Sequence, residues 1–185
     1  MPFIKVIEEN DASGRLKEIY NEVKQKRGKL SNILKIQSLL PETIYGHLAF
    51  YTSVMFSGTA LNREQKELIA TVVSALNKCS YCVNHHSEAL LHYWKDESKV
   101  KLAAEDYHQL KLSEKESAML GFAEKLTLNN NEMAEEDVLK LKESGFTDEE
   151  ILTIALVTGY FNFVNRIANA LGVEFSEDEK KGYKY

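Results

Sequence analysis

Helical periodicity with few interruptions is the feature that most limits how this chain can fold. Its 185 residues include only two prolines and nine glycines, and few runs alternate apolar with polar residues. Apolar residues instead recur at three- and four-residue intervals, which is the spacing of one face of a helix. The run Leu68, Ile69, Val72, Val73 and Leu76 is an example. The sequence therefore predicts an all-α fold.

Helix start and stop signals divide the chain into eight or nine helices. Asn62 with Gln65, and Ser113 with Glu116, have the spacing of capping boxes, and Thr147 is a further N-cap. We expect one domain over 1–175 and a C-terminal tail over 176–185. The first expected helix ends near 27, and a short second helix follows Ser31. The others span about 41–57, 62–77, 79–94, 97–105, 113–128, 135–144 and 148–171.

The last of these helices carries the longest apolar stretch, residues 151–171. Asn162, Asn165 and Arg166 interrupt it, which favours a helix buried in a core or a subunit interface over a membrane span. Polar groups on such a helix need partners when they are buried. We expect those partners to lie across a subunit boundary, in a homo-oligomer.

A weak internal echo links two parts of the chain. NREQKELIATVVSALN and TDEEILTIALVTGYFN share a cap, an acidic first turn and a closing Asn, and after a four-residue offset VNHHSEAL matches VNRIANAL. Two explanations stay open, an old duplication of a helix pair or two unrelated amphipathic helices.

The charge balance bears on partners and location. The 23 basic and 28 acidic residues give a net charge of −5, so no basic surplus exists to neutralise nucleic acid or an anionic membrane. The start, MPFIKVIEENDASG, has no long apolar run of a signal peptide. We therefore expect a cytoplasmic protein, in which thiols are kept reduced.

Both cysteines of the chain lie in one short run, KCSYCVNHHSEAL. On a helix, Cys79, Cys82 and His86 share a face, because residues three and seven apart point to nearly the same side. A structural zinc usually needs four ligands from two elements, and the sequence has no second cysteine or histidine pair. We therefore expect no metal, and a redox role instead.

The chemistry of this run supports the redox interpretation. Cys79 lies in the first turn of its expected helix, where free N–H groups and the helix dipole favour a thiolate. Two thiols at this spacing can close into a disulfide, and a nearby imidazole or carboxylate can move protons.

Residues 67–86, ELIATVVSALNKCSYCVNHH, have the pattern E-x11-C-x-x-C-x3-H. This pattern resembles the alkylhydroperoxidase D-like (AhpD-like) branch of the carboxymuconolactone decarboxylase superfamily. LSEKESAMLGFAEKLTLN and GFTDEEILTIALVTGYFNFVNRIANALGV extend the likeness to the subgroup called peroxidase-related enzymes. The resemblance implies an all-helical AhpD-like fold, a thiol peroxidase that reduces hydrogen or organic hydroperoxides, and a dimer or hexamer.

The resemblance also assigns roles. It places Glu67, Cys79, Cys82 and His86 in a catalytic relay, with Cys82 meeting the peroxide and Cys79 resolving the adduct. The helix-dipole argument alone would make Cys79 the thiolate. One departure concerns Tyr81, which stands where well-studied members have a histidine. A tyrosine is a poor proton acceptor near neutral pH, since its reference pKa is about 10.

Two other functions are compatible with these residues. A lactone decarboxylase does not need two cysteines, so the CxxC pair counts against it. A non-catalytic oligomeric redox sensor would use the dithiol to switch assembly. The peroxidase hypothesis needs a peroxide substrate and an external dithiol reductant or redox partner protein. No nucleotide-binding motif such as G-x-G-x-x-G is present, so we expect no bound cofactor.

Overall fold

The computed structural model describes residues 1–58, 60–176 and 179, and within them the chain is all-α. Two short 3-10 turns, Tyr107–Gln109 and Asn130–Glu132, join some of the helices. The nine α-helices of this part of the chain are α1 Gly14–Arg27, α2 Asn32–Lys35, α3 Pro41–Phe56, α4 Arg63–Leu76, α5 Ser80–Trp94, α6 Glu97–Glu105, α7 Glu114–Leu128, α8 Glu135–Glu143 and α9 Asp148–Leu171.

The predicted helix starts are confirmed by their hydrogen bonds. The Gln65 N–H donates to Asn62 Oδ1 over 2.9 Å, and the Asn62 N–H donates to Gln65 Oε1 over 3.0 Å. Equivalent capping boxes open α7 at Ser113 and α9 at Thr147. These local signals are legible in sequence because each needs residues only three positions apart.

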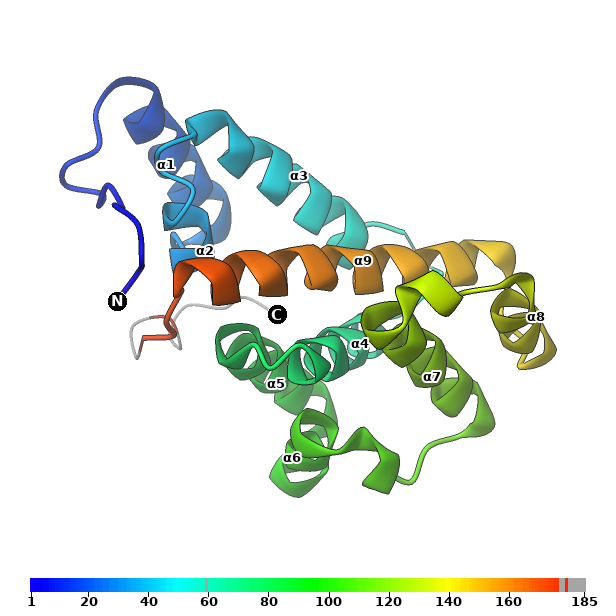
Figure 1. Ribbon diagram of the computed structural model, residues 1–185. Coiled ribbons are helices and arrows are strands. Elements are labelled where there is room, and N and C mark those ends of the chain that lie inside the picture. The colour runs from blue at the N-terminus through cyan, green and yellow to red at the C-terminus, as the bar shows by residue number, and fades with distance from the viewer. Residues whose placement is uncertain (59, 177–178, 180–185) are drawn as a thin grey trace.

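Helix α9 runs through the middle of the molecule (Figure 1). It packs against α3 on one side and against α4 and α7 on the other. Its Ile154, Val157 and Phe161 are fully buried and form the core together with residues such as Ile69 of α4 and Leu120 of α7. Because α9 contacts both α3 and the α4–α7 part of the bundle, it joins the N-terminal helices to the α4–α5 pair.

The C-terminal end of α9 is fixed by the start of the chain. Gly172 ends the helix in the left-handed conformation, with φ 65°, and the Val173 N–H donates to the Ala168 carbonyl over 2.9 Å. The Phe3 ring lies 2.7 Å from where a Cβ on residue 172 would stand, so only glycine fits without a shift. Of the predicted tail, 176–185, only Ser176 and Glu179 belong to the described residues.

The internal echo does not extend to two matching helix pairs. Its first copy is two helices, α4 and α5, separated at Asn77 and Lys78, whereas its second copy lies in the single uninterrupted helix α9. The prediction that Asn165 needs a partner across a subunit boundary is wrong, whereas the same statement about Arg166, which is exposed, stays a prediction. Asn165 is bonded to Asn77 and Ser74 of the same chain, and Arg166 donates to the Asn162 carbonyl and side chain.

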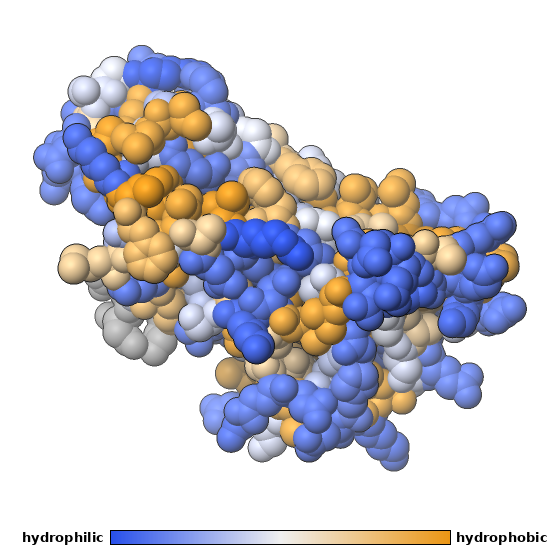
Figure 2. All heavy atoms as spheres, viewed as in Figure 1, coloured by the Kyte–Doolittle hydropathy of each residue, from blue (hydrophilic) through white to orange (hydrophobic). Residues whose placement is uncertain are grey.

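One face of α9 is apolar and exposed. Leu152, Leu156 and Phe163 are 58%, 40% and 49% exposed, and their spacing places them on one side of the helix. We refer to these three residues as the apolar stripe of α9. By length and composition α9 would also suffice to cross a membrane, but half of its most apolar window is buried inside the protein, as in a core helix. Figure 2 shows apolar atoms among polar ones over α3 and α9.

Candidate functional site

A sharp reversal between α4 and α5 creates the site. Lys78 adopts a left-handed conformation, with φ 53°, and the Cys79 N–H donates to the Ser74 carbonyl over 2.9 Å. Cys79 is then the N-cap residue of α5, one position before its first turn. The reversal folds α5 back along α4, so side chains on the two helices face each other.

Glu67 and His86 meet across this helix pair. Glu67 Oε2 lies 2.6 Å from His86 Nδ1, and the Glu67 side chain is fully buried. Its other oxygen, Oε1, lies 2.7 Å from Arg63 Nε, one turn earlier in α4. Burial alone would raise the pKa of the Glu67 carboxyl, but His86 and Arg63 outweigh this effect and hold the pKa below its usual range. The buried carboxylate is therefore kept charged.

Arg63 is a member of this cluster that the sequence analysis missed. Its guanidinium lies over the Phe56 ring, 3.8 Å from the centroid, and donates to the Met55 carbonyl. The sequence did contain a signal for Arg63, since an arginine and a glutamate four residues apart on one helix can form an ion pair. An exposed i, i+4 pair has the same spacing, so only the burial of Glu67 separates the two cases.

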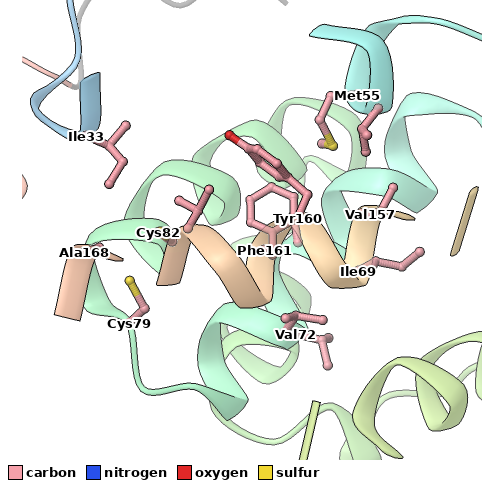
Figure 3. Close-up of a cluster of buried hydrophobic side chains, with 14 of the residues drawn as sticks. Ile33, Met55, Ile69, Val72, Cys79, Cys82, Val157, Tyr160, Phe161 and Ala168 are labelled. Atoms are coloured by element: carbon pink, nitrogen blue, oxygen red, sulfur yellow. The ribbon is translucent and has the colours of Figure 1, made fainter. Parts of the chain in front are cut away.

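The two cysteines are free thiols, and both are buried. Figure 3 shows them among apolar side chains, with Tyr160 and Phe161 of α9 nearby. A hydrogen bond from the Cys82 thiol, with further backbone and Asn165 donors, lowers the pKa of Cys79 to about 7 in spite of burial. The pKa of Cys82 is raised well above its usual value, because its proton is held by Cys79 and because it is desolvated. As pH rises above 7, the pair therefore comes to hold one proton, bound mainly at Cys82.

Asn165 is a second residue that reaches the thiols. It is fully buried on α9, and its side chain hydrogen-bonds toward both sulfurs and lowers the pKa of each. Asn165 Nδ2 also donates to Ser74 Oγ over 3.0 Å, and Asn165 Oδ1 accepts from Asn77 Nδ2 over 3.0 Å. The sequence indicated a buried polar group that needs partners, but not that the partners include the CxxC pair.

A pocket of about 410 Å³ opens onto this cluster. Cys82, His86 and Glu67 line it, whereas Cys79 is not among the lining residues. Three of the four predicted site residues therefore face one cavity, and Cys79 lies next to Cys82 away from the cavity. Further lining residues come from α2, α3 and α9, with Leu34, Tyr51 and Phe161 as examples, and from the end of α1 and the loop after it.

Tyr81 and His85 also line the pocket, but their polar atoms are engaged elsewhere. The Tyr81 hydroxyl donates to Glu179 Oε1 over 2.9 Å and accepts from the Ile33 N–H over 3.2 Å. His85 Nε2 lies 3.6 Å from the same Glu179 oxygen, and burial lowers the pKa of His85. The residue between the cysteines thus binds α2 and the C-terminal segment.

The three other histidines are dispersed through the described residues. His47 lies in the pocket wall, where its Nε2 is 2.8 Å from the Tyr160 hydroxyl. His108 lies beside Glu124 and His92 beside the Tyr93 ring. Residues 1–58, 60–176 and 179 contain no group of three His, Cys, Asp or Glu side chains placed to hold a metal ion.

The helical bundle and the buried CxxC pair, of which Cys82 lines a pocket, define an AhpD-like protein with a dithiol site. Residues 41–125 match the carboxymuconolactone decarboxylase family. The matched residues span α3 to α7 and include the α4–α5 pair that carries the site.

Solved structures extend the likeness over nearly the whole chain. A peroxidase-related protein from Ralstonia eutropha JMP134 with an alkylhydroperoxidase AhpD core is 29% identical, with a TM-score of 0.84 over 96% of this chain and 93% of that one. A peroxidase-related protein from Silicibacter sp. TM1040 is 28% identical, with a TM-score of 0.83 over 99% and 98%. The protein YdfG of Bacillus subtilis (strain 168) is 24% identical over 114 residues, which are 62% of this chain and 78% of YdfG. The predicted AhpD-like fold and the resemblance to this family are thereby confirmed.

Proposed function

We propose that the protein is a thiol peroxidase that reduces hydroperoxides and is reset by an external dithiol. The observation that carries the proposal is that Cys82, His86 and Glu67 line one pocket while Cys79 stands behind Cys82 as its hydrogen-bond partner. A nucleophilic thiol, a second thiol to resolve it and a buried acid–base pair are what peroxide reduction requires. The two peroxidase-related structures, at 29% and 28% identity, support it.

Access to the pocket and the proton shared by the two thiols decide which cysteine reacts first with the peroxide. Cys82 faces the pocket, so the substrate meets Cys82, although Cys79 is the more acidic thiol. Transfer of the Cys82 proton to Cys79 places the thiolate on the pocket side. This scheme reconciles the helix-start argument, which favours a Cys79 thiolate at rest, with attack by Cys82.

The reaction then proceeds in three balanced steps. The Cys82 thiolate takes the terminal OH of the hydroperoxide, the O–O bond breaks, and the alkoxide becomes an alcohol with a proton from His86. The Cys79 thiol condenses with the Cys82 sulfenic acid, forming the disulfide and releasing water. An external dithiol reduces the disulfide and becomes oxidised, and one of the returned protons restores His86. Glu67 orients His86 through the contact between Glu67 Oε2 and His86 Nδ1.

Steady-state consumption of hydrogen peroxide and cumene hydroperoxide with a dithiol reductant tests the proposal. The chain has only two cysteines, so each single Cys→Ser variant leaves one defined thiol. We expect Cys82→Ser to be inactive, and Cys79→Ser to reduce one equivalent and stop at a sulfenic acid. Mild oxidation of the wild type should lower its intact mass by two hydrogens. Direct conversion of both thiols to sulfinic acid would contradict the resolving role of Cys79.

The same experiment separates the peroxidase from the two alternatives. A redox sensor would form the disulfide and change its oligomeric state without steady turnover. A lactone decarboxylase would keep its activity toward a lactone after both cysteines are changed to serine. The presence of Cys82 in one pocket with Glu67 and His86 favours the peroxidase over both.

We also propose that the protein functions as a homo-oligomer. The apolar stripe of α9 is exposed in the single chain, and Phe50 of α3, 42% exposed, lies against Tyr160 of α9. A second copy of the chain would cover these side chains.

A further inference from the structure

The pocket above Cys82 is much larger than hydrogen peroxide requires. Its volume is about 410 Å³. A water molecule occupies roughly 30 Å³ of liquid, so the pocket has room for about a dozen waters, whereas hydrogen peroxide is close to two waters in size. Pockets of a few hundred Å³ lined by aromatic side chains are typical of sites for organic molecules.

The wall of the pocket is apolar and electrically neutral. Tyr51 of α3, Leu34 of α2 and Phe161 of α9 contribute rings or aliphatic groups. His47 contributes no charge, because burial, helped by nearby Arg27, lowers its pKa to about 4. Its two ring nitrogens are bonded to Gln37 and to the Tyr160 hydroxyl. The wall therefore suits the apolar body of a substrate.

The outer part of the pocket is positively charged. Lys26, Arg27 and Lys29, from the end of α1 and the loop after it, line it. Lys26 is exposed, and Arg27 and Lys29 are half-buried, in contrast to the buried Cys82. Glu67 is the one carboxylate among the described lining residues, and it is paired with Arg63 and hydrogen-bonded to His86. Glu179 lies behind the lining residues, where its carboxylate accepts from Tyr81 and its carbonyl accepts from Lys29, so Lys29 is less available than Arg27. This basic rim exists in a chain whose net charge is −5.

Arg27 is the rim residue best placed to receive an anion. Its guanidinium lies 4.7 Å from the centroid of the Tyr51 ring, which fixes it against the pocket wall. Among the described residues it forms no ion pair, unlike Lys24 one turn earlier, which pairs with Glu9. A guanidinium held on an aromatic face keeps its in-plane N–H donors available for a carboxylate.

We propose that the substrate is an organic hydroperoxide whose apolar body carries an anionic group, such as a carboxylate, at the end remote from the O–O bond. The O–O bond lies at Cys82, the apolar body contacts the α3 and α9 wall, and the anion binds Arg27. This inference rests on the proposed peroxidase function. It adds that the basic rim selects substrates that carry a negative charge.

The test compares a medium-chain hydroperoxy carboxylic acid with its methyl ester, which differ only in charge at the remote end. We expect the wild type to have a lower KM for the acid than for the ester. Arg27→Gln should raise the KM for the acid by about tenfold, the effect of losing one charge-assisted hydrogen bond. The KM for the ester should not change. Lys17→Gln is the matched control, since Lys17 is an exposed cation on α1 that does not line the pocket.

The two proposals fail in different ways. Equal KM values for acid and ester, or an equal rise for both in Arg27→Gln, would overturn the charge selection while turnover continued. Absence of turnover with every hydroperoxide would overturn the peroxidase function. In that case calorimetry with the unreactive hydroxy acid and its methyl ester, on wild type and Arg27→Gln, still measures the preference of the pocket for an anion. Equal affinity for the two compounds would overturn the charge selection as well.

Discussion

Glu67 Oε2 lies 2.6 Å from His86 Nδ1, although the two residues are on different helices and 19 positions apart. The contact exists because the chain reverses at Lys78 and lays α5 along α4. The His86 ring also stacks edge-on against Phe161, with centroids 4.5 Å apart, which holds the imidazole at the pocket. A fully buried carboxylate thus fixes the orientation of an imidazole that lines the same pocket as Cys82.

We predict that Glu67→Gln lowers the peroxidase rate by roughly 10²–10⁴-fold, the usual effect of losing an acid–base group. Glutamine has nearly the same shape and still accepts hydrogen bonds, so helicity and the unfolding transition should change little. Steady-state rates and circular dichroism measure both effects.

The matched control is Glu64→Gln in the same helix, because the Glu64 carboxylate accepts from Trp94 Nε1 outside the pocket. We expect this variant to keep its rate. A normal rate in Glu67→Gln together with a normal fold would show that the buried pair is structural.

The thiol pair should titrate in two widely separated steps. The pKa of Cys79 is about 7, and the pKa of Cys82 is raised well above its usual value. As pH rises through 7, the protein should therefore gain one thiolate, seen as increased ultraviolet absorbance, and the second should ionise only in strongly alkaline solution. Below pH 6 both thiols are protonated, and reaction with peroxide should slow.

A Cys82→Ala variant tests the cause of the low pKa. Alanine removes the thiol that donates to Cys79, so the remaining thiolate should appear at a higher pH than in the wild type. A serine at the same position keeps a donor and should preserve most of the shift. If alanine and serine gave the same titration, the hydrogen bond between the two sulfurs would not be the cause.

Much of the fold could be predicted from local signals in the sequence. The α4, α7 and α9 starts depend on contacts three residues apart, and the CxxC face depends on the period of one helix. Contacts between helices are different, because they depend on how the chain packs. The sequence could not show that Asn165 meets the thiols, or that Tyr81 bonds to Ile33 and Glu179.

The case of Asn165 shows that burial predicts that a polar side chain is hydrogen-bonded but does not predict which residues are its partners. A buried amide must be hydrogen-bonded, which holds for Asn165. The sequence favoured a neighbouring subunit, whereas the structure supplies Asn77 and Ser74, brought close by the same reversal that forms the site. Arg63 was missed for a related reason, since its spacing to Glu67 is common on exposed helix faces.

We predict that Asn165→Ala raises the pKa of Cys79 and slows the reaction of the reduced enzyme with peroxide at neutral pH. The amide hydrogen-bonds toward both sulfurs, so its loss removes a group that stabilises the thiolate. The protein should also lose about 1–3 kcal/mol of stability, because Ser74 and Asn77 lose a buried partner. A thiol titration and denaturant unfolding measure the two effects separately.

Asn162→Ala is the control for Asn165. Asn162 lies on the same helix and bonds to Asn77 and Thr127, and it does not contribute to the pKa of either cysteine. The Asn162→Ala variant should be less stable than the wild type, but its thiol titration should be unchanged. Identical thiol titrations in the two variants would mean that Asn165 acts only on the fold.

The last prediction concerns assembly through the apolar stripe of α9, Leu152, Leu156 and Phe163. Three large apolar side chains exposed on one helix face form a surface that a stable subunit contact would bury. An obligate interface of this kind covers on the order of 2,000 Å² or more in total. We expect light scattering at low micromolar concentration to give a multiple of the 21.1 kDa chain mass.

Leu156→Lys with Phe163→Lys should dissociate the assembly, since each lysine would place a charge in the apolar contact. Leu128→Lys, at an exposed apolar residue outside the stripe, should leave it intact. A wild-type monomer with full activity would refute the interface.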